Sequence, residues 1–135
     1  CKFIYSALHK KNYKVYLNHT RTSTFISDMV EGIINAYDNF KSGEVFNLSG
    51  SDYHNIKDVS DMILKKLNLK DDFVEYIETE KFTTKDKKTT NLKAIKEIKF
   101  KPKISLDEGL DKTINWMEDV YINNNFNKEN ILDYM

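Results

Sequence analysis

Short strand-like stretches alternate with amphipathic helices along this chain, and they are too few to form a doubly wound sheet by themselves. Alternating apolar and polar residues, rich in aromatic and β-branched side chains, predict strands at residues 13–17, 44–48 and 73–77. Apolar residues spaced by three and four predict helices at 3–10, 26–40, 56–67, 92–98 and from 106 onward. We therefore expect an α/β arrangement that is one portion of a larger fold.

The helix expected at residues 26–40 carries a long apolar stripe, and this stripe must pack on something. Its members are Ile26, Met29, Val30, Ile33, Ile34, Tyr37 and Phe40. A tyrosine within such a stripe is commonly buried, so we expect Tyr37 to be inside. Two other helices have clear start signals, an Asn55 cap and a capping box formed by Ser105 and Glu108.

The charge balance limits which kinds of partner we expect for this chain. Its 21 basic and 21 acidic residues cancel, which gives no reason to expect nucleic acid or an anionic membrane as a partner. The apolar runs fall far short of the roughly 20 residues that span a bilayer, and no signal-like leader opens the chain. We therefore expect a cytoplasmic protein. A single cysteine, Cys1, excludes an intrachain disulfide.

The domain organisation follows from length and composition. A chain of 135 residues suits one compact core. Residues 1–121 contain all the expected strands and helices and form a single unit in this prediction. Residues 122–135 are rich in asparagine, so we expect a partly disordered tail there.

Arg21 is the most distinctive basic residue, because the other 20 of the 21 basic residues are lysines. Lysine solvates a surface as well as arginine does, but it cannot copy the planar fork that binds a phosphate or carboxylate through two parallel hydrogen bonds. Arg21 is therefore a candidate anion-binding residue. The alternative is a structural ion pair with a carboxylate.

Several kinds of chemistry are not expected from this chain. Only four glycines occur, and none forms the glycine-rich turn that cradles a dinucleotide. Two Tyr-x-x-x-Lys matches, at 37–41 and 53–57, resemble an acid/base pair, but neither lies beside a dinucleotide turn, and we do not assign them a catalytic role. His9, His19 and His54 lack the spacing of metal ligands.

Several segments, taken in order, resemble the carboxyl-terminal, substrate-binding part of the extended short-chain dehydrogenases that act on nucleotide sugars. The first are Val15-Tyr16, His19-Thr20-Arg21 and the aromatic-Ile-x-Asp stretch at 25–28, which opens a helix. The others are Glu44-Val45-Phe46-Asn47-Leu48-Ser49-Gly50, the stretch from Lys93-Ala94 to Phe100-Lys101-Pro102, Ser105-Leu106-Asp107-Glu108-Gly109-Leu110, and Thr113-Ile114-Asn115-Trp116. The resemblance covers most of the chain and implies the carboxyl-terminal portion of an extended Rossmann-type fold.

The resemblance implies roles for particular residues. The arginine that matches Arg21 binds the substrate diphosphate in that family, and Tyr16, Asn18, His19 and Thr20 would lie beside the nucleotide. Residues 81–88 stand where relatives supply a second cation. Lys85 or Lys87 is therefore a possible substitute, although a solvated loop explains the segment equally well.

The complete enzyme would use NAD or NADP to oxidise the sugar transiently at C4, as a 4,6-dehydratase or epimerase. The resemblance places the cofactor site and catalytic residues in another half, so this chain alone should bind no cofactor and be inactive. A homodimer through that half is possible. A nucleotide-sugar decarboxylase or reductase shares the same binding part, and a small non-enzymatic binding module is the alternative from another class.

Overall fold

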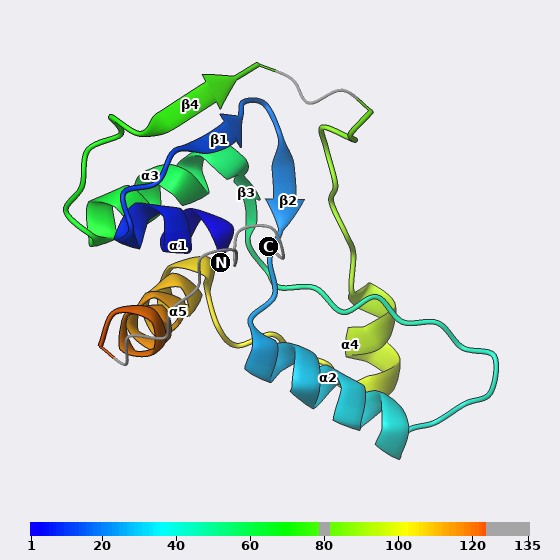
Figure 1. The fold of residues 1–135 in the computed structure, drawn as a ribbon. Coiled ribbons are helices and arrows are strands. Elements are labelled where there is room, and N and C mark those ends of the chain that lie inside the picture. The colour runs from blue at the N-terminus through cyan, green and yellow to red at the C-terminus, as the bar shows by residue number, and fades with distance from the viewer. Residues whose placement is uncertain (79–81, 124–135) are drawn as a thin grey trace.

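The computed structural model describes residues 1–78 and 82–123 of the chain. Five α-helices, four short strands and a terminal π-helix follow one another in a mixed α/β order (Figure 1). They are α1 (Lys2–Leu8), β1 (Tyr13–Tyr16), β2 (Thr20–Thr22), α2 (Ile26–Asp38), β3 (Tyr53–Asn55), α3 (Ile56–Lys66), β4 (Val74–Ile77), α4 (Leu92–Ile98), α5 (Leu106–Glu118) and η1 (Asp119–Asn123). The mixed α/β class expected from the sequence is confirmed.

The strands form two separate two-stranded sheets. β1 pairs in parallel with β4, so that Tyr13 lies opposite Val74. β2 pairs antiparallel with β3, and Arg21 lies opposite His54. The polar segment after β1 therefore contains a strand, β2, whose partner β3 comes from about thirty residues further along the chain.

The larger hydrophobic core lies between α1, α3 and α5, which are grouped on one side of the molecule (Figure 1). Its buried members are Ile4, Tyr5, Ala7, Ile63, Leu64, Leu110, Ile114 and Met117. Both expected helix starts are present: the Asn55 side chain accepts from the amide of Lys57 at 2.9 Å, and the Ser105 hydroxyl accepts from the amide of Glu108 at 3.2 Å.

A smaller core lies where α4 meets α2. Ala94, Ile98 and Phe100 are buried there, with Leu48 packed against them. Gly32 allows the close approach, because a β-carbon at this position would stand 2.9 Å from side-chain atoms of both Leu48 and Phe100. α2 therefore turns a small residue, not its apolar stripe, toward the protein.

The described part of this chain does not supply the surface on which the stripe of α2 was expected to pack. Five of its large apolar side chains are between 46% and 80% exposed, namely Ile26, Val30, Ile33, Ile34 and Tyr37; Phe40, just beyond the helix, is 75% exposed. Tyr37, expected inside, is the most exposed of them. The buried positions of α2 are Asp28 and Gly32, so the helix packs through its other face and no described element covers the stripe. Exposed apolar patches of this kind mark surfaces that meet a partner.

The strand expected at residues 44–48 is also wrong. This segment has no regular structure, although Phe46 and Leu48 pack on the smaller core. A strand requires a hydrogen-bonded neighbour, and the described part of the chain supplies none here. Lys93 instead holds the segment from the side, through the Glu44 carboxylate and the carbonyl oxygen of Val45 at 3.1 Å.

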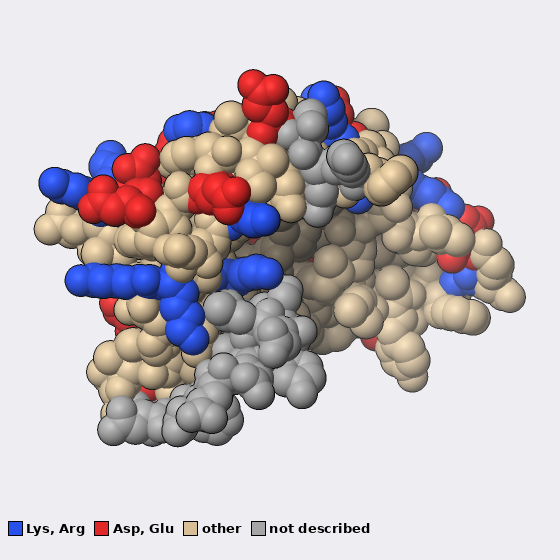
Figure 2. Space-filling model, turned by 45° about the horizontal axis from the view of Figure 1, so that its top comes forward, with Lys and Arg blue, Asp and Glu red and all other residues tan. Residues whose placement is uncertain are grey.

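The end of the chain is described only in part. Residues 119–123 continue α5 as the short π-helix η1, whereas residues 124–135 of the expected tail lie outside the described residues. Figure 2 shows basic and acidic side chains interspersed over the visible face, in line with the neutral charge balance. Within the described chain, no helix is both long and apolar enough to cross a bilayer.

Candidate functional site

A tight turn after β1 places the candidate residues next to one another. Leu17 continues the sheet by donating its amide to the carbonyl oxygen of Ile77 at 2.7 Å. Asn18 then adopts a left-handed conformation with φ of 59°, which asparagine tolerates better than most residues. The turn redirects the chain within two residues, so that β2 begins at Thr20 and enters the second sheet.

His19 is the last residue of this turn, and it is buried. Its side chain is only 2% exposed, and Nδ1 lies 2.8 Å from the carbonyl oxygen of Leu17. Its own carbonyl oxygen accepts from the amide of Ile56, the first residue of α3, at 2.8 Å. The imidazole therefore lies within the protein, with the half-buried ring of Tyr16 at 5.8 Å between centroids.

Arg21 is held by backbone carbonyl groups. Its Nη1 donates to the carbonyl oxygen of Thr20 at 2.7 Å and to that of Lys85 at 3.0 Å. Among residues 1–78 and 82–123, no carboxylate forms an ion pair with it, whereas several lysines do have carboxylate partners. A half-buried guanidinium fixed at one nitrogen keeps its other N–H groups and its full charge for an anion.

The segment around Lys85 lies directly beside Arg21. The amide of Thr20 donates to the carbonyl oxygen of Lys85 at 2.8 Å, and the amide of Lys87 donates to the carbonyl oxygen of Thr20 at 3.2 Å. Thr20 and Asp86 therefore form a parallel bridge at the edge of the β2–β3 sheet. Lys85 and Lys87 are exposed, and within the described part of the chain neither forms an ion pair.

Four further residues complete the surroundings and were not singled out from the sequence as site residues. The Thr20 hydroxyl hydrogen-bonds the Tyr53 hydroxyl at 2.7 Å and donates to the Asp86 carboxylate. On β3, His54 places Nε2 3.1 Å from the Ser23 hydroxyl. Burial lowers the pKa of His54 and outweighs the opposing effect of nearby acids. No local pattern reveals these contacts, because each joins residues more than thirty positions apart.

A cavity of about 390 Å³ begins two residues beyond Arg21. Ser23, Thr24 and Phe25, which connect β2 to α2, form one wall. The other walls come from α1, α3 and the start of α5, and include Cys1, Phe3, Val59, Leu106 and Gly109. Arg21 itself does not line this cavity, which is connected to it through the segment that follows β2. In the described residues, no group of three acidic, histidine or cysteine side chains could hold a metal ion.

The sequence of this chain is similar to those of a few known proteins. No family model matches the sequence. A UDP-N-acetyl-alpha-D-glucosaminuronate decarboxylase of Bacillus cytotoxicus is 29% identical over 127 residues, which covers 88% of this chain and 39% of that protein. An uncharacterized protein of Methanocaldococcus jannaschii is 32% identical over 119 residues, covering 85% of this chain and 36% of that protein.

The solved structures agree with each other in fold. The UDP-glucuronic acid 4-epimerase of Bacillus cereus, in complex with UDP-glucuronic acid and NAD, superposes with a TM-score of 0.79 at 24% identity, over 89% of this chain and 39% of that chain. The dTDP-glucose 4,6-dehydratase of Bacillus anthracis, in complex with NAD, gives a TM-score of 0.77 at 22% identity, over 87% of this chain and 37% of that chain. This chain has the fold of the carboxyl-terminal part of an extended short-chain dehydrogenase.

The shared fold confirms the resemblance and the fold class expected from the sequence. The chain spans less than two fifths of the length of the curated relatives that it matches. The structure brings Arg21, Thr20, Lys85 and Lys87 of the predicted site together, places Tyr16 at the end of β1, and buries His19 in the turn between them.

Proposed function

We propose that this chain holds the diphosphate of a nucleotide sugar, as the substrate-binding part of an NAD(P)-dependent nucleotide-sugar 4,6-dehydratase or epimerase. One observation carries the proposal: the Arg21 guanidinium is half-buried, anchored through Nη1 to two carbonyl oxygens, and has no carboxylate partner among the described residues. A half-buried cation without its own counter-ion favours an anionic ligand.

The neighbouring lysines support the same ligand. Lys85 and Lys87 come from a segment that is hydrogen-bonded to β2, so two exposed lysines stand next to the anchored Arg21. A diphosphate carries its charge over several oxygens and can engage all three. A hydrogen bond to a charged group contributes about 1.5–3 kcal/mol net. Arg21 is the main contributor in this proposal because its planar guanidinium can bind phosphate through two parallel hydrogen bonds, which lysine cannot.

The role of these residues is positioning. Binding the diphosphate at a distance from the reacting carbon holds the sugar in place, and the chemistry belongs to groups elsewhere in the enzyme. The neighbours from Bacillus are described as complexes with NAD, and this chain has no glycine-rich turn for a dinucleotide. NAD or NADP would therefore be bound by the rest of the enzyme, which we place in the cytoplasm as a possible homodimer through that part.

The uncovered stripe of α2 supports this division. Ile33, Ile34 and Tyr37 are exposed on a helix that follows directly from the Arg21 strand, and residues 44–48 have a strand-like sequence without a strand partner. An α/β domain that carries the cofactor would cover the exposed stripe of α2 and provide a strand partner for residues 44–48. Residues 1–121 then form the substrate-binding portion, and residues 122–135 a tail.

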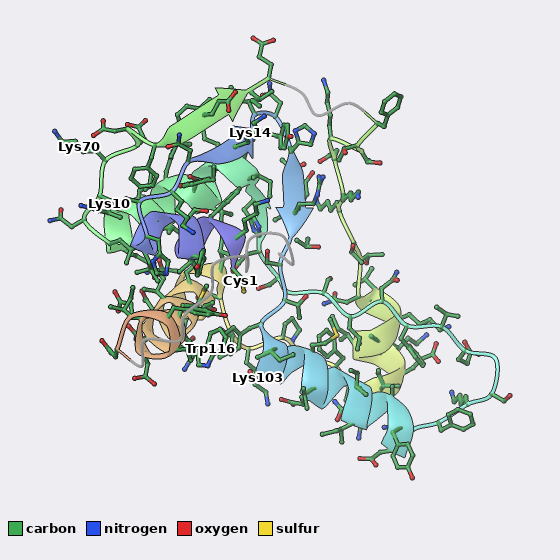
Figure 3. All side chains as sticks on the ribbon, in the orientation of Figure 1. Cys1, Lys10, Lys14, Lys70, Lys103 and Trp116 are labelled. Atoms are coloured by element: carbon green, nitrogen blue, oxygen red, sulfur yellow. The ribbon has the colours of Figure 1, made fainter. Side chains whose placement is uncertain are left out.

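Calorimetric titration of the chain with UDP and with UDP-glucuronic acid tests the proposal. Arg21→Lys keeps the charge but loses the planar fork, and we expect it to weaken binding by about tenfold, with Arg21→Ala weaker still. Lys70→Ala is the control, because it also removes one positive charge and lies far from β2 (Figure 3). Equal effects of Arg21→Ala and Lys70→Ala would reject a specific site. In the intact enzyme, Arg21→Lys should leave NAD binding nearly unchanged.

A decarboxylase is the second candidate for the parent enzyme, favoured by the Bacillus cytotoxicus relative at 29% identity. Both candidates use the same diphosphate handle, so binding to this chain does not separate them. Release of carbon dioxide from a UDP-uronic acid by the intact enzyme would favour the decarboxylase. Epimerisation or loss of water without carbon dioxide would favour our first proposal.

A further inference from the structure

The strand pairing sorts the residues around Arg21 onto two faces. Side chains of directly paired residues point to the same face of a sheet, and neighbours along a strand point to opposite faces. Thr20 pairs with Asn55 on one side and Asp86 on the other, while Arg21 pairs with His54. One face therefore carries Thr20, Asn55 and Asp86. The other carries Arg21 and His54, and alternation on either side of the bridge at Asp86 would direct Lys85 and Lys87 to this second face.

The contacts agree with this assignment. On the first face, the Thr20 hydroxyl reaches both the Tyr53 hydroxyl, at 2.7 Å, and the Asp86 carboxylate. Lys88, two residues after Asp86 and hence on the same face, places its ammonium 5.2 Å from the centre of the Tyr53 ring. The Arg21 guanidinium donates to the main-chain carbonyl oxygen of Lys85, so this segment lies within its reach. The only acid of the 85–88 segment is thus turned away from the three cations.

We propose that Thr20 is a positioning residue, whose hydroxyl latches the Asp86 carboxylate and thereby holds Lys85 and Lys87 on the Arg21 face for the diphosphate of a nucleoside diphosphate. This inference rests on the function proposed above. It adds Lys85 and Lys87, held in a fixed position, to the same diphosphate site. Thr20 and Asp86 touch each other and not the ligand. They act by fixing the strand register of residues 85–87.

The proposal requires that the pairing of residues 85–87 with β2 be held in one register. Residues 85–87 are exposed and are joined to β2 through two backbone hydrogen bonds, both made by Thr20. A slip of one residue would turn Lys85 and Lys87 to the far face and bring Asp86 beside Arg21, replacing attraction for an anion with repulsion. A bond from the Thr20 hydroxyl to a carboxylate opposes that slip, because it is available only in the observed register.

Thr20→Val is the test variant, because valine has the shape and strand preference of threonine but no hydroxyl. Thr20→Ser, which keeps the hydroxyl, is its matched control. We expect Thr20→Val to weaken UDP binding to the chain by about tenfold and Thr20→Ser by less than about twofold, with similar melting temperatures. Proton exchange of the Lys87 amide should become faster in Thr20→Val only. If Thr20→Val bound UDP as tightly as the wild-type chain does, the proposed role of Thr20 would be wrong.

A double-mutant cycle separates positioning from a general structural effect. In a chain that already carries Lys85→Ala and Lys87→Ala, Thr20→Val should have no further effect on UDP affinity, because nothing is left to position. A full tenfold loss in that background would overturn the inference. Failure of wild-type chain to bind UDP at all rejects the proposed function itself, whereas binding that depends on Arg21 but is indifferent to Thr20 rejects only the latch.

Discussion

Gly50 lies against Ser23 so closely that a β-carbon on the glycine would stand 1.9 Å from the Ser23 carbonyl oxygen. The amide of Gly50 also donates to the hydroxyl of Thr24 at 2.8 Å. Two segments that are distant in sequence therefore meet without a side chain between them. Because Ser23 directly follows β2, this contact sets where the Arg21 strand ends.

We expect Gly50→Ala to destabilise the chain by about 2 kcal/mol, since the backbone of Ser23 has to move. The same shift should weaken UDP binding, which calorimetry can measure beside chemical unfolding. Gly43→Ala is a useful comparison: Gly43 has φ of 81° with open space around it, so alanine there costs about 1 kcal/mol of strain without touching β2. UDP affinity that falls equally in both variants would show that Gly50 does not act through the site.

Asp28 connects α2 to the segment that leads into α5. Its Oδ2 accepts from the amides of Lys103 and Ile104, both at 3.0 Å, and the residue is 3% exposed. Asp28→Ala leaves two amides without an acceptor and should cost about 3 kcal/mol of unfolding free energy. Asp28→Asn retains one oxygen acceptor, so we expect a loss of about 1 kcal/mol. Urea unfolding followed by circular dichroism measures both, and equal losses would contradict the hydrogen-bonding explanation.

The elements that the sequence predicted correctly are those whose signals are local. α3 begins at its Asn55 cap, α4 occupies residues 92–98 as expected, and the strand expected at 73–77 is β4. Caps and helical spacing act within a few residues, so they can be read without knowing the rest of the fold. The sole arginine was likewise visible in the composition.

The surroundings of Arg21 could not be predicted in this way. Its contact with the carbonyl oxygen of Lys85 spans 64 positions, and that of Thr20 with Tyr53 spans 33. Such pairings depend on tertiary packing and leave no periodic signal. The expected strand at 44–48 fails for the converse reason, because its local pattern is suitable but the described chain offers no neighbouring strand.

The stripe of α2 allows a direct test of which face of this helix is packed. Ile33 is 57% exposed and Phe100 is 1% exposed. Ile33→Glu should therefore change the free energy of unfolding by no more than about 0.5 kcal/mol, whereas Phe100→Ala should cost about 4 kcal/mol. Chemical unfolding at two protein concentrations provides the measurement. A large, concentration-dependent loss for Ile33→Glu would mean that a second copy covers the stripe in solution.

The half-buried imidazole of His54 should make stability depend on pH. Burial lowers its pKa below the ordinary value near 6.5, and this effect exceeds the opposing ones of Asp52 and Asp58. The unfolded chain then binds the proton more readily than the folded chain, so stability is complete above pH of about 6.5 and declines as the pH falls through that value. His54→Gln removes the titrating group. Urea unfolding between pH 8 and 5.5 should show a steeper decline for wild type than for His54→Gln, and parallel curves would contradict the assigned direction.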